Sequence, residues 1–266
     1  MLRYFLVVAI VAIAGRACAE SVTFPSAPAG SSTAAPEIQG VIYRPAGAGP
    51  SPAIVVMHGC GGVSPRTSAW GRRLADWGYV ALVLDSFSPR GVKGVCTTPG
   101  VVTPNMRVAD VAGALDFLGQ QADVVKGRYG LIGFSHGGST AIRATQKRFD
   151  LARRGLVASV AYYPGCNPAF DREVDVPLLI LIGDKDDWTR ADRCRTLQAS
   201  GLARPDLVDA VYYPDAVHAF DGNVKDRTVA GSGGKTHRLA YDPIAAPDAE
   251  ARTRAFLATY LPFNRP

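Results

Sequence analysis

Short apolar runs alternate with longer amphipathic segments along most of this chain. Each run is rich in Val, Ile, Leu or Tyr and is bounded by Gly, Pro or Asp, a pattern typical of buried strands. The runs cover residues 38–45, 53–59, 79–87, 129–135, 156–164, 177–184 and 208–214. Residues 21–37 are small and polar, and we expect them to run over the surface as an edge strand and a loop.

The segments between these runs have the apolar spacing of amphipathic helices. They predict helices over residues 67–77, 106–120, 139–147, 190–200 and 246–261. Strands that alternate with helices favour an α/β fold, in which a mostly parallel central sheet is flanked by helices on both faces. The chain shows no internal repeat and no long linker, so we predict a single domain over residues 20–266.

The first 19 residues have the pattern of a secretory signal peptide. Arg3 precedes an apolar stretch at residues 4–14, and Ala17, Cys18 and Ala19 form a small-x-small end, which predicts cleavage after Ala19. The apolar stretch is shorter than the roughly 20 residues that cross a bilayer, and Arg16 follows it, so a permanent membrane anchor is disfavoured. We therefore expect a secreted protein, with the periplasm as the favoured destination.

Charge and cysteine content narrow the classes of function. The net charge of +6 is scattered rather than clustered, which disfavours nucleic-acid binding. After cleavage four cysteines remain, an even number that favours pairing in an oxidising compartment, with three connectivities open. Their spacing is not that of metal ligands, and we expect no metal and no cofactor. The four cysteines are Cys60, Cys96, Cys166 and Cys194.

A lone serine follows one of the predicted strands. In "YGLIGFSHGGST", residues 129–140, Ser135 lies between Gly133 and Gly137, which allow a tight strand-to-helix turn. Such a turn lifts the hydroxyl above the carboxyl end of the sheet, where ligands bind in this class of fold. The alternative is a glycine-rich turn with a serine that caps the helix. We favour Ser135 as a nucleophile because the chain also supplies the partners that a serine needs.

A serine nucleophile needs a base that titrates near neutral pH and a carboxylate that orients the base. Of the four histidines, His218 follows the last predicted strand, whereas His237 lies in "GSGGKTHR", which we expect to be an exposed loop. Asp186 follows the strand at 177–184 and is the predicted acid, with Asp187 as the alternative. The chain order Ser135, Asp186, His218 is that of α/β-hydrolases.

Backbone amides complete the predicted site. The amide of His136 lies at a helix N-terminus, where it faces developing negative charge. In "VVMHGCGG" the glycines let the amide of Cys60 or Gly61 approach a ligand closely. We expect one of these two amides to join that of His136 in an oxyanion hole.

Taken together, these motifs resemble the dienelactone hydrolase family of α/β-hydrolases. The resemblance covers nearly the whole mature chain, in "HGCGG", "DSFSPRG", "GFSHGG", "GDKDDWT", "YPDAVHAFD" and "YDPIAAPDAEARTRAFL". It implies an α/β-hydrolase fold and the hydrolysis of esters or lactones. The enzymes that gave the family its name use a cysteine nucleophile, whereas this chain has Ser135 at the matching position, as esterases do.

The resemblance also places the cysteines and the pocket. It puts Cys60 and Cys96 on loops at the carboxyl ends of neighbouring strands, and Cys166 near the helix that holds Cys194, so we predict disulfides within these two pairs. Each is worth about 2–4 kcal/mol. The matching loop of the family borders the substrate, with Arg90 facing either a substrate carboxylate or a structural partner. The predicted pocket residues are Asp85, Phe87, Arg90, Tyr163 and Trp188.

These observations predict an exported serine hydrolase that cleaves a small carboxylic ester or lactone through an acyl-enzyme. One alternative is a peptidase or acyltransferase on the same scaffold, although a chain of this length leaves no room for an inserted lid domain. The other is a non-enzymatic binding module that has kept the fold. The sequence does not indicate an oligomeric state.

Overall fold

The computed structural model describes residues 18–27, 35–47, 49–222 and 225–263. Most of the predicted signal peptide, residues 1–17, lies outside this range, and the two remaining residues of that peptide begin the first strand. Within the described part of the chain, no helix is long and apolar enough to cross a membrane.

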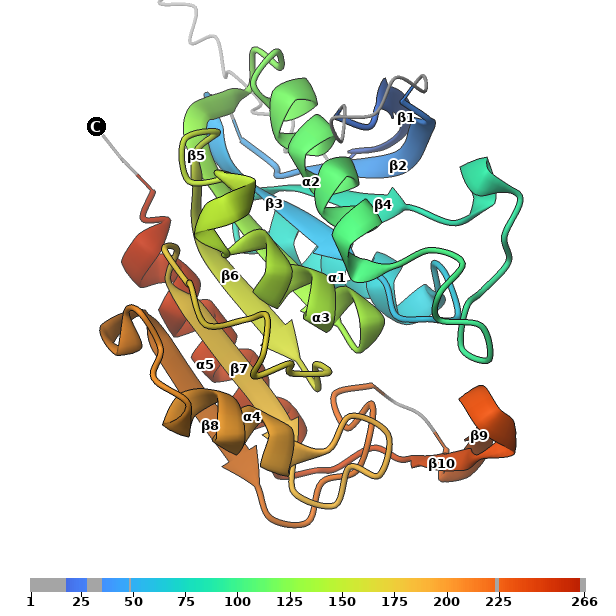
Figure 1. The fold of residues 1–266 in the computed structure, drawn as a ribbon. Coiled ribbons are helices and arrows are strands. Elements are labelled where there is room, and N and C mark those ends of the chain that lie inside the picture. The colour runs from blue at the N-terminus through green and yellow to red at the C-terminus, as the bar shows by residue number, and fades with distance from the viewer. Residues whose placement is uncertain (1–17, 28–34, 48, 223–224, 264–266) are drawn as a thin grey trace, which may run out of the picture.

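An eight-stranded sheet forms the centre of the molecule (Figure 1). The strand order across the sheet is β1-β2-β4-β3-β5-β6-β7-β8. The pairs β1–β2 and β2–β4 are antiparallel, and every following pair in this order is parallel. The strands are β1 (Cys18–Pro25), β2 (Glu37–Arg44), β3 (Ser51–Met57), β4 (Val80–Asp85), β5 (Val124–Phe134), β6 (Leu156–Tyr162), β7 (Leu178–Gly183) and β8 (Val208–Tyr213).

Helices cover both faces of this sheet. In Figure 1, α2, α3 and α4 lie in front of the sheet, and α1 and α5 lie behind it. The two rear helices are joined by an ion pair between Arg73 and Glu250. The helices are α1 (Pro65–Asp76), α2 (Pro104–Leu118), α3 (His136–Ala144), α4 (Ala191–Ala199) and α5 (Ala245–Tyr260), with single 3₁₀ turns at Ser88–Arg90, Lys147–Phe149, Pro205–Leu207 and Ser232–Gly234.

The inner strands are apolar on both faces because helices bury both faces. Every residue of β7, and all of β3 after Ser51, is buried. Such strands read as continuous apolar runs rather than alternating ones, which is why they stand out in the sequence. The predicted α/β fold with a mostly parallel sheet is confirmed.

Two local predictions differ from the structure. Helix α3 begins at His136, three residues before the amphipathic pattern predicts, because the chain turns into the helix directly after Ser135. The expected exposed loop is present at residues 232–235, but it does not include His237. That residue lies on the second strand of a hairpin formed by β9 (Arg227–Ala230) and β10 (Thr236–Leu239), and its ring is buried against Trp188.

Candidate active site

A sharp turn between β5 and α3 presents Ser135. Its backbone has φ 54° and ψ −114°, a conformation that is strained for a residue with a side chain. The turn is possible only with small neighbours, since a Cβ at Gly133 would lie 2.0 Å from the carbonyl oxygen of Gly137. A Cβ at Gly137 would lie 2.4 Å from the carbonyl oxygen of Met57 on β3. These glycines therefore allow α3 to pack tightly against the sheet. Ser135 lies between them, directly after the carboxyl end of β5.

The structure brings Ser135, His218 and Asp186 into one hydrogen-bonded chain. The Nε2 atom of His218 is 2.9 Å from the hydroxyl oxygen of Ser135, and its Nδ1 atom is 2.8 Å from Oδ2 of Asp186. A carboxylate only accepts hydrogen bonds, so Nδ1 carries the proton and Nε2 is free to accept from the serine. All three side chains are buried, with only 8% of Ser135 exposed.

Asp186 is held more firmly than its neighbour in sequence. Its carboxylate accepts hydrogen bonds from the amides of Trp188 and Thr189 and from the Thr189 hydroxyl, at 2.8–2.9 Å. Asp187 instead contacts Nδ1 of His237 at 3.3 Å, and 52% of its side chain is exposed. The geometry therefore places Asp186, and not Asp187, beside the His218 imidazole.

Aromatic rings fix the plane of the His218 ring. Tyr163 meets it edge-on with ring centroids 4.8 Å apart, and Trp188 packs against it at 5.0 Å. Trp188 also stacks on His237 with ring centroids 4.6 Å apart, which connects the β9–β10 hairpin to the loop after β7. These contacts hold the imidazole in the orientation in which Nε2 faces Ser135.

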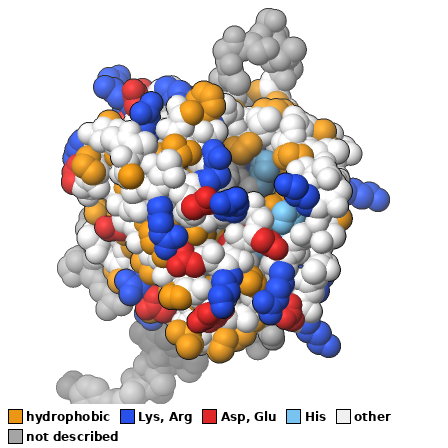
Figure 2. Space-filling view, turned by 60° about the horizontal axis from the view of Figure 1, so that its bottom comes forward, with side chains coloured by type: hydrophobic (Ala, Val, Ile, Leu, Met, Phe, Trp, Pro, Cys, Tyr) orange, Lys and Arg blue, Asp and Glu red, His pale blue; other side chains and the backbone are white. Residues whose placement is uncertain are grey.

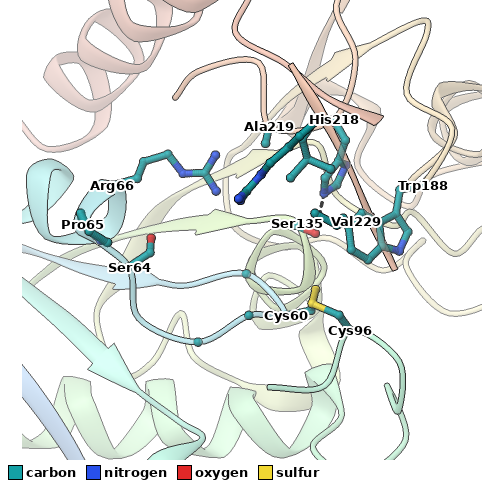
Figure 3. A pocket seen from close by; sticks show the side chains of 15 residues that line it. Cys60, Ser64, Pro65, Arg66, Cys96, Ser135, Trp188, His218, Ala219 and Val229 are labelled. Atoms are coloured by element: carbon teal, nitrogen blue, oxygen red, sulfur yellow. Dashed lines mark hydrogen bonds between the residues drawn. A yellow bond between two sulfur atoms is a disulfide. The ribbon is translucent and has the colours of Figure 1, made fainter. Parts of the chain in front are cut away.

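A cavity of about 380 Å³ opens above Ser135. In Figure 3, Ser135 and His218 point toward each other at its floor, and Trp188 lies beside them. The guanidinium of Arg66 points toward the cavity from the start of α1. In Figure 2, histidine side chains are visible in a hollow with basic side chains around it. The remaining lining residues are Gly59–Gly62, Ser64, Pro65, Cys96, Ala219, Arg227, Val229 and Leu239.

The turn at Gly59–Gly62 forms one wall of this cavity. Within the described residues, the amides of Cys60 and Gly61 donate no hydrogen bond to another protein group. The carbonyl of Cys60 accepts from the amide of Val95, and a disulfide joins Cys60 to Cys96. The turn is thus fixed in place while two of its amides remain free.

Both predicted disulfide pairings are present in the structure. Cys60 and Cys96 are partly exposed and line the cavity, whereas Cys166 and Cys194 are buried and join the segment after β6 to α4. Each bond therefore closes a loop next to the candidate site.

Only Trp188 of the five predicted pocket residues lines the cavity. The carboxylate of Asp85 accepts from the amides of Phe87 and Ser88 in its own turn, and the Phe87 ring is buried under the loop. Tyr163 lies beneath His218 and donates from its hydroxyl to Asp221.

Arg90, the fourth predicted pocket residue that does not line the cavity, has a structural partner. Its guanidinium donates two hydrogen bonds to the carboxylate of Asp110, at 2.7 and 2.9 Å, and a third to the carbonyl of Ser86. The Asp110 side chain is completely buried. Of the two expected roles of Arg90, the geometry therefore shows contact with a structural partner and not with the cavity.

Two basic residues of the cavity, Arg66 and Arg227, were not predicted from the sequence. Arg66 follows the glycine turn by only a few residues, and that position was a usable signal. Arg227 lies on β9, where nothing in the local sequence indicates a return to the site. Arg66 is 3.3 Å from Asp221, and no ion pair of Arg227 is present within the described residues. No carboxylate is among the lining residues, so the cavity is basic.

The fold and the serine, histidine and aspartate at its carboxyl edge define the class as α/β-hydrolase. The model of the dienelactone hydrolase family matches residues 38–261. The chain belongs to the dienelactone hydrolase family.

Known relatives are distant in sequence. A curated protein of a Bradyrhizobium species, named "Probable 2-oxo-3-(5-oxofuran-2-ylidene)propanoate lactonase", is 26% identical over 232 residues, which cover 83% of this chain and 88% of the relative. A dienelactone hydrolase structure from Anabaena variabilis has a TM-score of 0.66 at 18% identity and covers 93% of this chain and 100% of its own. An esterase structure from Pyrococcus furiosus has a TM-score of 0.65 at 15% identity, with 92% and 93% covered. The two structural matches show the fold alone.

Proposed function

We propose that this protein is a serine hydrolase that cleaves a small carboxylic ester or lactone through an acyl-enzyme. The observation that carries the proposal is the buried chain of hydrogen bonds from Ser135 through His218 to Asp186 at the floor of a cavity. Membership of a hydrolase family and the distant lactonase relative support it.

The geometry supports a two-step reaction. The Ser135 oxygen attacks the carbonyl carbon while Nε2 of His218 takes the serine proton, and Asp186 stabilises the imidazolium that forms. The amides of His136 and of Cys60 or Gly61 hold the oxyanion. When the C–O bond breaks, His218 returns the proton to the leaving alcohol, which in a lactone stays attached to the acyl group. Water, activated by the same histidine, then hydrolyses the acyl-serine.

Substitution of Ser135 tests this proposal. Ser135→Ala should lower kcat toward 4-nitrophenyl acetate by about 10⁴-fold, because the three side chains act as a unit. KM and the thermal midpoint should change little, since the side chain is small. Steady-state rates of the two proteins under identical conditions decide the matter. Retention of more than about a tenth of the wild-type kcat would remove Ser135 from this role.

Arg66 and Arg227 favour a substrate that carries a carboxylate. Asp221 partly balances the Arg66 charge, but that carboxylate also accepts from Tyr163 and Trp70, and the cavity itself holds no acidic side chain. The distant lactonase is named for a propanoate, which is also an acid. A free anionic group would therefore gain charge-assisted hydrogen bonds in this cavity.

A pair of matched lactones tests the charge preference. A γ-butyrolactone with a carboxylate on the ring and the same ring with a carboxamide differ by one charge. We expect kcat/KM to be about tenfold higher for the acid, and Arg66→Gln to remove most of that preference through KM. Arg227→Gln should reduce the preference less, since its side chain lies in solvent. An equal loss toward both lactones in Arg66→Gln would contradict this assignment.

We further propose export to the periplasm. The N-terminal pattern of residues 1–19 and the two disulfides support it, because such bonds persist in oxidising compartments. Fractionation of cells that express the full chain, with N-terminal sequencing of the product, tests both the compartment and the cleavage after Ala19. A cytoplasmic protein that retains Met1 would contradict the proposal.

A further inference from the structure

We propose that Arg107 is a positioning residue that holds together the two halves of the oxyanion hole. The inference rests on the proposed function of the Ser135 site. Arg107 lies on α2 and its side chain is completely buried. One terminal nitrogen, Nη1, donates to Nδ1 of His136 at 2.9 Å. The other, Nη2, donates to the backbone carbonyl of His58 at 2.9 Å.

The two contacts of Arg107 join the two segments that supply the oxyanion amides. His136 is the first residue of α3 and contributes the amide beside the nucleophile. His58 follows the last residue of β3 and directly precedes the turn at Gly59–Gly62. One rigid, planar guanidinium therefore fixes the distance between these segments, which are far apart in the chain. Within the described residues these are the hydrogen bonds that the Arg107 side chain makes.

This guanidinium has no ion-pair partner within the described residues. Asp110 is engaged by Arg90, and the Asp85 carboxylate binds amides of its own turn. The Nε atom has no hydrogen-bond partner, and the ring of Phe87 lies 5.1 Å from the guanidinium carbon. The charges of Asp110 and Asp85 favour the Arg107 cation, but neither carboxylate contacts it, and burial without a direct partner is costly, so packing stability alone does not account for its position. Its position is explained if its two hydrogen bonds hold the oxyanion amides in place and its charge favours the negative oxyanion nearby.

Both histidines of this cluster act as hydrogen-bond acceptors and must therefore be neutral. Nδ1 of His136 accepts from Arg107, and Nε2 of His58 accepts from the amide of Ser86 at 3.3 Å. The remaining His58 nitrogen, Nδ1, donates to the carbonyl of Gly59 at 2.7 Å. Burial and the charge of Arg107 lower the pKa of both imidazoles to about 3. The His58 ring thereby holds the first residue of the glycine turn through the Gly59 carbonyl, and Arg107 holds the preceding carbonyl, that of His58.

A matched pair of substitutions at His136 tests the inference without removing its backbone amide. Asn and Leu have nearly the same shape, but Oδ1 of Asn can accept the Arg107 hydrogen bond where Nδ1 now does, and Leu cannot. We expect kcat of His136→Leu to be at least tenfold below that of His136→Asn, with KM values within about threefold, because a misplaced amide acts on the transition state. Affinity for butylboronic acid, which forms a tetrahedral adduct with a serine, should fall by a similar factor.

The same pair in an Arg107→Met background isolates the arginine. If the hydrogen bond between the two side chains is the cause, the Asn and Leu variants should become equal in kcat once the arginine is gone. An unchanged difference in that background, or equal kcat and boronate affinity for the two variants of the wild-type background, would overturn the inference. Thermal midpoints of all variants establish that they are folded.

The wild-type protein provides a measurement that needs no variant. A long-range ¹H–¹⁵N spectrum of the imidazoles should show, from about pH 5 to pH 8, His136 neutral with its proton on Nε2 and His58 neutral with its proton on Nδ1. An imidazolium at either position, or a proton on Nδ1 of His136, would contradict the proposed clamp. If the wild type neither binds the boronate nor reacts with a fluorophosphonate, the proposed function itself fails, and the inference fails with it.

Discussion

Buried histidines lie on two sides of Ser135, with His218 on one side and His58 and His136 on the other, and the charges that face them are opposite in sign. On one side the Nδ1 atom of His218 faces the carboxylate of Asp186 at 2.8 Å. On the other side His58 and His136 lie against the cation of Arg107, which opposes such a charge. The same side chain type is the proposed proton carrier beside a carboxylate and a neutral hydrogen-bond acceptor beside a guanidinium.

In the proposed reaction, these histidines lie on either side of Ser135 and serve the two charges that ester cleavage creates. The transition state places positive charge on His218 and negative charge on the carbonyl oxygen. A carboxylate lies beside His218 and a guanidinium lies beside His136. Substitutions on the two sides should therefore change catalysis to different extents.

The largest effect should follow loss of the carboxylate that faces His218. Asp186→Asn keeps the shape but reverses the hydrogen bond to Nδ1, and we expect kcat to fall by about 10⁴-fold. Asp187→Asn is the matched control one residue away, and it should change kcat by no more than about threefold, because Asp187 contacts His237 instead. Steady-state kinetics of both variants measure this. A larger loss in Asp187→Asn than in Asp186→Asn would reverse the assignment of the acid.

Loss of either disulfide should lower stability, but only loss of the Cys60–Cys96 bond should also lower kcat. Replacing Cys166 and Cys194 by Ser should lower the free energy of unfolding by about 2–4 kcal/mol with little change in kcat. Replacing Cys60 and Cys96 by Ser should lower it by a similar amount and also reduce kcat about tenfold, because this bond holds the cavity turn. Urea denaturation and kinetics of each double variant test this. Equal kcat for the two variants would show that the turn keeps its geometry without the bond.

The smallest effect on kcat belongs to the neutral histidines, which give the protein a pH dependence of stability. The pKa of His58 and of His136 is about 3 in the folded protein and 6.5 in the unfolded chain. Between these values the unfolded chain binds protons that the folded chain does not. The free energy of unfolding should therefore fall with decreasing pH, by about 1.4 kcal/mol per pH unit for each histidine.

His136→Asn isolates one of these two contributions. Urea denaturation at about pH 4, 5 and 6 should give this variant a shallower pH dependence than the wild type, by about 1.4 kcal/mol per pH unit. Groups that titrate in both proteins cancel in the difference. Equal slopes would mean that His136 is protonated in the folded protein, which the contact with Arg107 forbids.

Much of the fold, and the set of Ser135, His218 and Asp186, was predictable from the sequence because each depends on local patterns. Continuous apolar runs mark strands buried on both faces, and the glycines around Ser135 mark a turn that no larger residue allows. The choice between Asp186 and Asp187 was not decided by sequence, since it depends on the amides of Trp188 and Thr189 that hold one carboxylate.

The rest of the site depends on contacts between distant segments. The β9–β10 hairpin brings Arg227 over the cavity, and the short polar strands that form it carry no strong periodicity. Arg90 resembled a substrate contact in sequence, but its partner Asp110 lies on α2 and is visible only in space. Arg107 had no sequence signal, since a lone arginine on a predicted helix is normally exposed.

The proposed acyl-enzyme on Ser135 is tested most directly by the mass of the protein during turnover. After rapid mixing with 4-nitrophenyl acetate and an acid quench, peptide mapping should find one acetyl group per chain on the hydroxyl of Ser135. The modification should be absent from Ser135→Ala. Hydrolysis at the wild-type rate with no acyl group on Ser135, or with the acyl group on another residue, would contradict the mechanism.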